Sequence, residues 1–418
     1  MSTAATRQVV ITGMGLVAPC GIGRQAFWDG MQQEGSYLAP YTAASHSSII
    51  SGYAAHVPEE WKAEQYMPRK LLRQTDRYTQ FAMAATVLAL QDANLHLEHE
   101  NLERIGVILA STLGGMEFAE RELHTLWTRS PRSVSPYQSI AWFYAASQGQ
   151  ITISHGLRGY SKSIVSDRAG GIQALGHAYQ AVKEGRADII LAGGSEAPLT
   201  PFNMFCYAGA DFVNTRAKRA EQAYLPFDRE GAGVALGEGA ALLVLEEYEH
   251  ARRRNAPVLA HVSGYATNCE ARAPLADYQI HGQKLAQALL HCVEPELTTE
   301  PPDYIHADGL ALYGADMAEV TALQTYLGKR AHHVPISVPK ARIGDAIGAG
   351  GAFAAALTVL SLQQQCLLPT PYVAAHRLIA DLDFVIGEPR AAVVQHALVV
   401  ARSTAGINAV MAFTHPEA

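Results

Sequence analysis

The amino-acid sequence predicts an α/β fold in which helices pack on sheets in layers. Short β-rich apolar runs alternate with helical patterns along the whole chain, and several of these runs contain no polar residue. Strands of that kind are typical of sheets that helices cover on both faces. With 418 residues, 49% of them hydrophobic, the chain is long enough to bury a large core and to form two domains of ordinary size.

The first half of the chain supplies four predicted strands and four predicted helices. Strands are expected where aliphatic and β-branched residues cluster, and helices where apolar residues recur with helical spacing. The expected strands are residues 8–12, 106–110, 189–192 and 241–245, and the expected helices are residues 24–32, 76–93, 115–127 and 171–184.

The second half continues the alternation and weakly repeats the first. Its expected strands are residues 258–265, 304–306, 391–396 and 409–413, and its expected helices are residues 282–290, 315–327 and 349–364. A Gly-rich turn opens an Ala-rich helix in each half, at residues 168–171 and 348–351. The polar segment 246–257 separates the two, so we expect an N-terminal half over residues 1–250 and a C-terminal half over residues 258–418.

Composition and cysteine usage exclude several classes of protein. The net charge of −7 predicts no broad basic surface for nucleic acid, and the low charged fraction of 17% favours a large subunit interface. The five Cys are far apart and form no CxxC pair, which indicates a reducing cytosol rather than disulfides or a zinc site. No signal-peptide or transmembrane pattern is found, so we expect a cytoplasmic protein that does not enter a membrane.

Two local features allow more than one interpretation. Three consecutive Arg at 252–254 could dock an acidic protein partner, or they could form the solvated end of a helix. The Gly-Met-Gly sequence at 13–15 follows a strand as in a dinucleotide fold, but Pro19 stands where the helix of that fold should run. The His residues show no spacing typical of a metal site. We therefore expect neither a cofactor nor a metal.

Four segments together resemble one family. They are ITGMGLVAPCG at 11–21, LPFDRE at 225–230 followed by GEGA at 237–240, IHADG at 305–309, and VPKARIGD at 338–345 followed by AIGAGGA. In this order and spacing they resemble the β-ketoacyl synthases of fatty acid and polyketide assembly. The resemblance covers essentially the whole chain. It implies a thiolase fold, with two similar α/β halves in five αβαβα layers, and a dimer.

The resemblance also shows which catalytic groups are missing. An active ketosynthase carries its acyl chain on a Cys at a helix N-terminus, and two His residues assist decarboxylation and stabilise the oxyanion. Arg168 stands at the Cys position, and Asp308 and Asp345 stand at the two His positions. The family Lys is retained as Lys340, and a Phe-rich Gly loop is rewritten as residues 402–408.

These replacements predict that the chain has no condensation activity of its own. Arg168 is always protonated and cannot form a thioester, and an Asp cannot replace a His as a neutral donor. A buried Arg must be paired with an anion. We therefore expect an internal network in which Arg168 pairs with carboxylates, for which Asp167, Asp308 and Asp345 are the candidates.

A narrower resemblance points to a branch of the family without the Cys. Residues 135–145, 149–159 and 169–178 look like the chain length factors, which pair with an active ketosynthase in type II polyketide synthases. That branch usually carries Gln at the Cys position, whereas this chain has Arg168. The difference argues against a decarboxylation that depends on Gln.

The segment 113–127 contains a possible tunnel wall. Met116, Ala119 and Leu123 are spaced i, i+3 and i+7, so they share one face of a helix, and periodicity alone favours a core-facing stripe. The resemblance implies instead that this face lines the polyketide tunnel at the heterodimer interface. Because these side chains are small or flexible, we expect a deep or straight tunnel that suits a long polyketone or a linear polyene.

The leading hypothesis is a non-catalytic chain length factor that pairs with an active ketosynthase acting on chains bound to acyl carrier protein. Two other interpretations stay open. The chain could be an independent enzyme, such as a malonyl decarboxylase or an acyl-binding hydrolase, that uses Arg168, Asp308 and Asp345 in new chemistry. It could also be a homodimeric scaffold. The need for a partner distinguishes the three interpretations, because only a chain length factor should be inactive alone and copurify with a ketosynthase.

Overall fold

The computed structural model describes residues 7–45, 48–271, 282–293 and 301–417. Its central feature is a continuous sheet of eleven strands whose two ends have the same topology. The first end contains, in spatial order, β6 (Lys162–Ile164), β5 (Ile105–Ala110), β7 (Ile189–Glu196), β9 (Gly239–Glu247) and β1 (Val9–Ala18). The second contains β12 (Ile336–Ser337), β11 (Tyr304–His306), β15 (His396–Arg402), β16 (Ile407–Thr414) and β10 (Ala260–Cys269).

Both sets follow the same strand order. Numbered along the chain within each half, the strands lie in the order 3-2-4-5-1, and the fifth strand, β9 or β16, runs antiparallel to its two neighbours. A short antiparallel contact between β1 and β10 joins the two sets. The weak internal repeat of the sequence thus corresponds to a repeat of topology. The exact division between residues 250 and 258 stays a prediction; it falls on α9 (Tyr248–Arg253) and the turn that follows.

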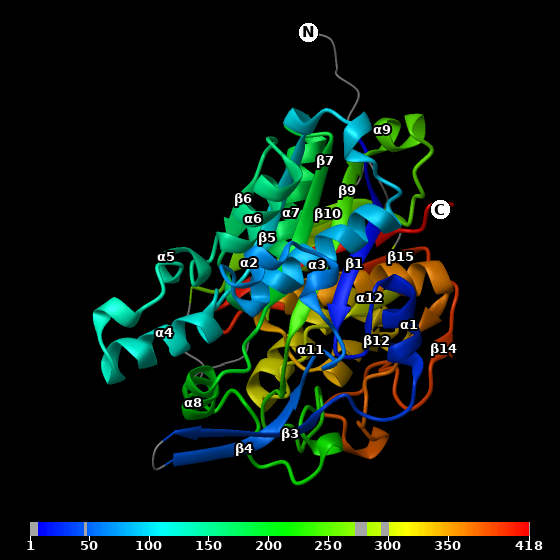
Figure 1. The fold of residues 1–418 in the computed structure, drawn as a ribbon. Coiled ribbons are helices and arrows are strands. Elements are labelled where there is room, and N and C mark those ends of the chain that lie inside the picture. Colours follow the sequence, from blue (N-terminus) through cyan, green and yellow to red (C-terminus); the bar gives the residue numbers. More distant parts are fainter. Residues whose placement is uncertain (1–6, 46–47, 272–281, 294–300, 418) are drawn as a thin grey trace.

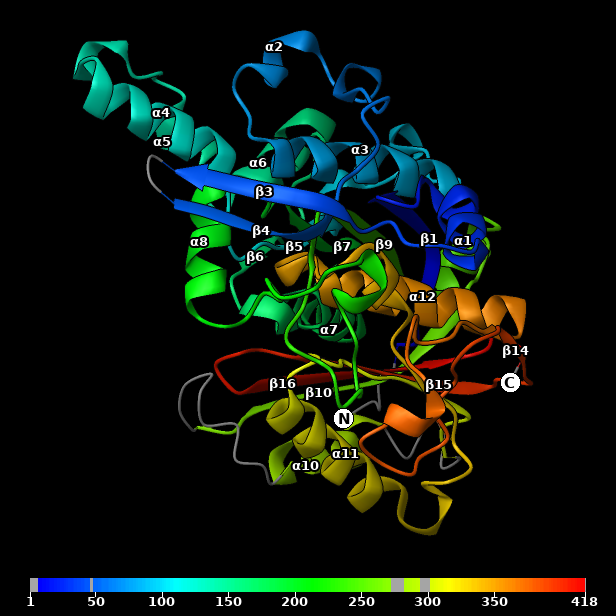
Figure 2. The ribbon, with the colours of Figure 1, turned by 90° about the horizontal axis from the view of Figure 1, so that it is seen from below.

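Helices form three layers around the two sets of strands (Figures 1 and 2). One outer layer contains α3 (Arg77–Asp92) and α6 (Ala146–His155), which cover β1, β9, β7 and β5. The middle layer contains α7 (Gly170–Lys183) and α12 (Gly350–Gln364), and the other outer layer contains α10 (Gln283–Cys292) and α11 (Tyr313–Leu327). Figure 2 shows these layers edge-on. The predicted αβαβα arrangement is confirmed.

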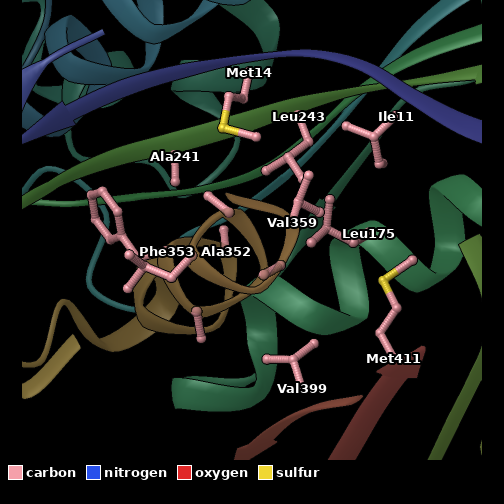
Figure 3. Packing of buried hydrophobic residues seen from close by; sticks show 14 of the residues in the cluster. Ile11, Met14, Leu175, Ala241, Leu243, Ala352, Phe353, Val359, Val399 and Met411 are labelled. Carbon is pink, nitrogen blue, oxygen red and sulfur yellow. The ribbon is translucent and has the colours of Figure 1, made fainter. Parts of the chain in front are cut away.

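The middle layer is the centre of the core. Figure 3 shows Leu175 of α7 and Val359 of α12 packed among side chains of both sets of strands. The two helices approach closely at Gly171, where a Cβ atom would lie 2.5 Å from the backbone nitrogen of Ala352. Among the described residues, one helical segment, Ile347–Gln364, is long and apolar enough to cross a membrane, but 89% of it is buried inside the protein. It is a core helix.

The predicted elements are largely present, with three differences. The strand expected at 391–396 is wrong, because the strand begins at His396 and is buried from Ala397 to Arg402, whereas Val393 before it is 78% exposed. The first strand runs to Ala18, beyond the predicted residue 12, because Gly15 lets it lie against α3; a Cβ there would be 1.8 Å from the carbonyl oxygen of Ala85. The small sheet of β3 (Ala39–Ser45), β4 (Ser48–Ala55) and β8 (Leu236–Gly237) was not expected.

Candidate functional site

The fold brings together Arg168, Asp308 and Asp345, the three residues that the family resemblance predicts at the catalytic positions. Arg168 lies in the turn before α7, Asp308 follows β11, and Asp345 follows the short helix Pro339–Ile343. The Arg168 Nε atom donates to Asp345 Oδ2 at 2.8 Å, and Nη1 donates to Asp308 Oδ2 at 2.5 Å. Nη2 lies 2.7 Å from the same Asp345 oxygen but is poorly aligned for a hydrogen bond. The ion pairs expected with Asp308 and Asp345 are present.

Lys340 adds a second cation to Asp308. Its Nζ atom donates to Asp308 Oδ1 at 2.8 Å, so each carboxylate oxygen of Asp308 faces a different cation. Burial alone would raise the pKa of Asp308, but Arg168 and Lys340 outweigh it and hold that pKa at about 2. Burial likewise disfavours the charge on Arg168, and the carboxylates of Asp308 and Asp345 raise its pKa well above the ordinary value. Arg168 and Asp308 therefore stay charged across physiological pH.

A fourth ion pair, between Arg402 and Glu319, lies next to Asp308. Glu319 on α11 accepts hydrogen bonds from the backbone nitrogens of Asp308 and Gly309, at 2.7 and 3.1 Å. The Nη1 atom of Arg402 lies 3.8 Å from Oε2 of Glu319 and donates a hydrogen bond to the carbonyl oxygen of Ala315 at 2.7 Å. The carbonyl oxygen of Arg402 in turn accepts from Arg168 at 3.1 Å. Desolvation raises the pKa of Glu319, and the nearby charge of Arg402 opposes this.

We call Arg168, Lys340, Arg402, Asp308, Asp345 and Glu319 the buried ion cluster. Its side chains are at most 7% exposed, and its three cations face three carboxyl groups. Such a closed arrangement satisfies the strong requirement that buried charges be paired. The guanidinium of Arg168 is held by two of these carboxylates and cannot form a thioester.

Asp167 does not belong to this cluster, so its predicted role as a partner of Arg168 is wrong. The Asp167 backbone has a positive φ of 50°. Its carboxylate accepts from the backbone nitrogen and the hydroxyl group of Thr404, at 2.6 and 2.7 Å. Asp167 therefore anchors the loop 402–408 beside the cluster, while its neighbour Arg168 binds Asp308 and Asp345.

His306 is the imidazole closest in sequence to Asp308, and it is fully buried in β11. Neither of its ring nitrogens has a hydrogen-bond partner in the described structure. Burial, together with the charge of Lys340, lowers its pKa well below the ordinary value, so it stays neutral. Across the described residues, no group of His, Cys, Asp or Glu side chains could hold a metal ion.

The predicted tunnel residues lie on a different element, α4 (Met116–Thr128). This helix projects away from the layered body in both views (Figures 1 and 2). Ala119 is buried, whereas Met116 and Leu123 are half-buried. The turn before α4 is joined to the region of the cluster by Glu196, which accepts from the backbone nitrogens of Thr112 at 2.7 Å and Gly348 at 3.1 Å. Their role as a tunnel wall stays a prediction.

Sequence reasoning missed Glu319, Glu196 and the side chain of Arg402. The available signal for Glu319 was a pair of acidic residues, Asp316 and Glu319, in an otherwise mostly apolar helical pattern, ALYGADMAEV, shortly after the IHADG segment. An acid on a core-facing helix needs a partner, and Arg402 in the rewritten loop was a candidate. The three Arg residues at 252–254 do not all face solvent. Arg254 pairs with the buried Glu246 at 2.6 Å, which leaves only part of the triplet for an external partner.

Two family comparisons cover most of the chain. Residues 6–251 match the β-ketoacyl synthase N-terminal domain and residues 259–373 match the β-ketoacyl synthase C-terminal domain. Among curated proteins, the chain is 36% identical over 416 residues to the tetracenomycin polyketide synthase ketoacyl synthase beta subunit of Streptomyces glaucescens, covering 97% of this chain and 98% of that protein. It is 30% identical over 417 residues to 3-oxoacyl-[acyl-carrier-protein] synthase 2 of Synechocystis, with 99% of both chains covered.

Solved structures give the same picture. A complex of a type II polyketide synthase acyl-carrier protein with its ketosynthase, bound to the hexaketide, contains a chain that matches with a TM-score of 0.89 and 28% identity, covering 98% of this chain and 99% of that one. The ishigamide ketosynthase/chain length factor matches with a TM-score of 0.86 and 22% identity over 98% and 99% of the two chains, which supports the fold alone. The chain belongs to the β-ketoacyl synthase family.

Proposed function

We propose that this chain is the non-catalytic chain length factor of a type II polyketide synthase. It pairs with an active ketosynthase and supplies one wall of the tunnel in which the acyl chain grows. The observation that carries this proposal is the buried ion cluster, in which Arg168, Asp308 and Asp345 fill the positions of the nucleophile and its two assisting His residues. The similarity to the tetracenomycin beta subunit supports the same assignment.

A partner is also supported by the surface. Large apolar side chains are exposed on α4, α6, α8 (Pro201–Gly209) and next to the edge strand β6, which lie on one side of the molecule in Figures 1 and 2. They include Trp127 and Ile153, each 76% exposed, Val165, and Phe202. Exposed apolar groups of this size and an open strand edge are typical of a surface that another subunit covers.

The partner carries out the chemistry in this proposal. Its Cys holds the growing chain, and acyl carrier protein delivers the extender units for decarboxylative condensation. Met116, Ala119 and Leu123 of α4 face the chain from this subunit and limit its length. The complex works in the cytoplasm. An independent decarboxylase or hydrolase receives no support, because the charged groups of the cluster face one another and are almost completely buried.

Coexpression with an active type II ketosynthase subunit tests the proposal. We expect a one-to-one heterodimer by size-exclusion mass determination and condensation only by the pair. Ile153→Asp should abolish assembly by placing a charge in the apolar surface. The matched control is Val393→Asp, because Val393 is 78% exposed and lies near β14 (Arg390–Ala391), on the other side of the molecule (Figure 1). A stable homodimer of this chain with activity of its own would contradict the proposal.

A further inference from the structure

Helix α4 has little apolar packing to hold it against the body. Of its thirteen residues, Phe118, Ala119 and Glu122 are buried, and its far end carries the exposed Trp127. A helix that buries so few side chains needs other contacts to fix its position. Carboxylates provide them, each by accepting a hydrogen bond from a backbone N–H group.

The contact at the start of α4 comes from Asp76, the N-cap residue of α3. One of its oxygens, Oδ1, accepts from the backbone nitrogen of Tyr78 at 3.0 Å, and Oδ2 accepts from that of Phe118 at 2.7 Å. A single carboxylate, 2% exposed, thus binds the first turns of two helices. Both N-termini present unsatisfied N–H groups and the positive end of a helix dipole, which favour an anion at this point.

The backbone before α4 also packs closely against Asp76, so the start of this helix has little freedom to move. A Cβ atom on Gly115, the residue before α4, would lie 2.8 Å from the Cβ of Asp76 and 2.1 Å from the carbonyl oxygen of Ala141. The start of α4 is therefore confined between Asp76 and the chain at Ala141. Met116 and Ala119 lie within one turn of Phe118, so a shift of this turn moves both.

Two further carboxylates hold the rest of the helix. Glu122 accepts at 2.7 Å from the backbone nitrogen of Ser135, in the chain that returns from α4. Glu120 accepts at 2.6 Å from that of Phe202, in the first turn of α8. These contacts connect α4 to neighbouring surface segments, whereas Asp76 connects it to the rigid outer layer of the core.

We propose that Asp76 is a positioning residue that sets the product length of the complex by fixing where the first turn of α4 meets the growing chain. This inference rests on the proposed function of α4 as a tunnel wall. Asp76 does not touch the acyl chain; it acts through the placement of Met116 and Ala119. The competing role for Asp76 is purely structural, as the cap of α3.

Asp76→Ser separates the two roles. The Ser hydroxyl can still cap α3 by accepting from the Tyr78 N–H group, but it is too short to reach Phe118 as well. In the heterodimer we expect the ratio of the main product to products of other lengths to fall by about threefold to tenfold, as one hydrogen bond is lost. Thermal unfolding of the same preparation shows whether the fold is kept. Asp76→Asn, which keeps one acceptor oxygen, should give a smaller shift in the same direction.

Glu117→Gln is the matched control. Glu117 is an exposed carboxylate in the same turn of α4, so its substitution removes the same charge without touching the Phe118 contact. We expect its product distribution to equal that of the wild type. An unchanged distribution in Asp76→Ser would overturn the inference. If Ala119→Trp, which acts on the tunnel directly, shifts the products while Asp76→Ser does not, the proposed function stands and only the inference fails. If neither shifts them, both fail.

Discussion

Arg168 places a permanent charge in the interior, and its surroundings show how that charge is tolerated. Its guanidinium is paired with Asp345 and Asp308. Lys340 pairs with Asp308, Glu319 pairs with Arg402, and every member of the cluster is buried. A buried ion pair gains Coulomb energy only against a large desolvation cost, so the cluster is not a strong source of net stability. Its members are nevertheless interdependent, since removing one leaves an uncompensated charge.

Arg168→Ala should therefore destabilise the chain strongly. We expect the free energy of unfolding to fall by about 3–5 kcal/mol, because Asp308 and Asp345 would lose their shared partner inside the protein. Denaturant unfolding of the heterodimer at constant protein concentration measures this loss. Arg158→Ala is the control, because Arg158 pairs with Glu103 on the surface, where an ion pair contributes less than about 1 kcal/mol. Equal free energies of unfolding in Arg168→Ala and Arg158→Ala would show that the buried carboxylates do not depend on Arg168.

The sequence could identify the cluster only in part. The family motifs placed Arg168, Asp308 and Asp345 at related positions, and the need to pair a buried Arg predicted their contact. The same argument also admitted Asp167, because it is adjacent to Arg168. Only the local backbone, with its positive φ at Asp167, directs that side chain to Thr404. Periodicity and motif spacing do not carry this information.

At the scale of single elements, α4 shows the difference between finding a helix and placing it. The predicted helix 115–127 corresponds closely to Met116–Thr128. Its projection from the body depends on long-range contacts, such as those of Asp76 and Glu120, that have no signature in the local sequence. The small sheet of β3, β4 and β8 was missed for a related reason, since β3 (APYTAAS) and β4 (SIISGYAA) show neither a continuous apolar run nor a regular alternation of polar and apolar residues.

Ala119→Trp tests α4 as the tunnel wall. In the proposed complex the face of α4 that carries Ala119 lines the tunnel, so an indole ring at this position would narrow the space available to the growing chain. In the partner complex we expect loss of the longest products and accumulation of shorter ones, measured by mass spectrometry of the released polyketides. His124→Trp introduces the same ring at an exposed position on the other side of the helix and should leave the product length unchanged. Unchanged products in Ala119→Trp would argue that this face is a simple core stripe.

At the scale of the whole molecule, the cluster lies at the junction of the two repeated halves. Arg168 comes from the turn before α7 in the first half, and Asp308, Lys340 and Asp345 come from the second. The middle layer of α7 and α12 packs between the two sets of strands (Figure 3), and Arg168 and Asp345 lie in the turns just before these two helices. The layered class and this layer were predictable from buried strands and Gly-rich turns. The strand order and the merging of both sets into one sheet were not.

The proposed function requires that this subunit carry no acyl chain at any stage of turnover. Intact-protein mass spectrometry of the heterodimer, taken during turnover with acyl carrier protein, tests it most directly because each subunit is weighed separately. We expect the acyl adduct on the ketosynthase alone, with this chain at its unmodified mass, because the guanidinium of Arg168 cannot form a thioester and is bound to Asp308 and Asp345. A covalent acyl adduct on this chain during turnover would contradict the account.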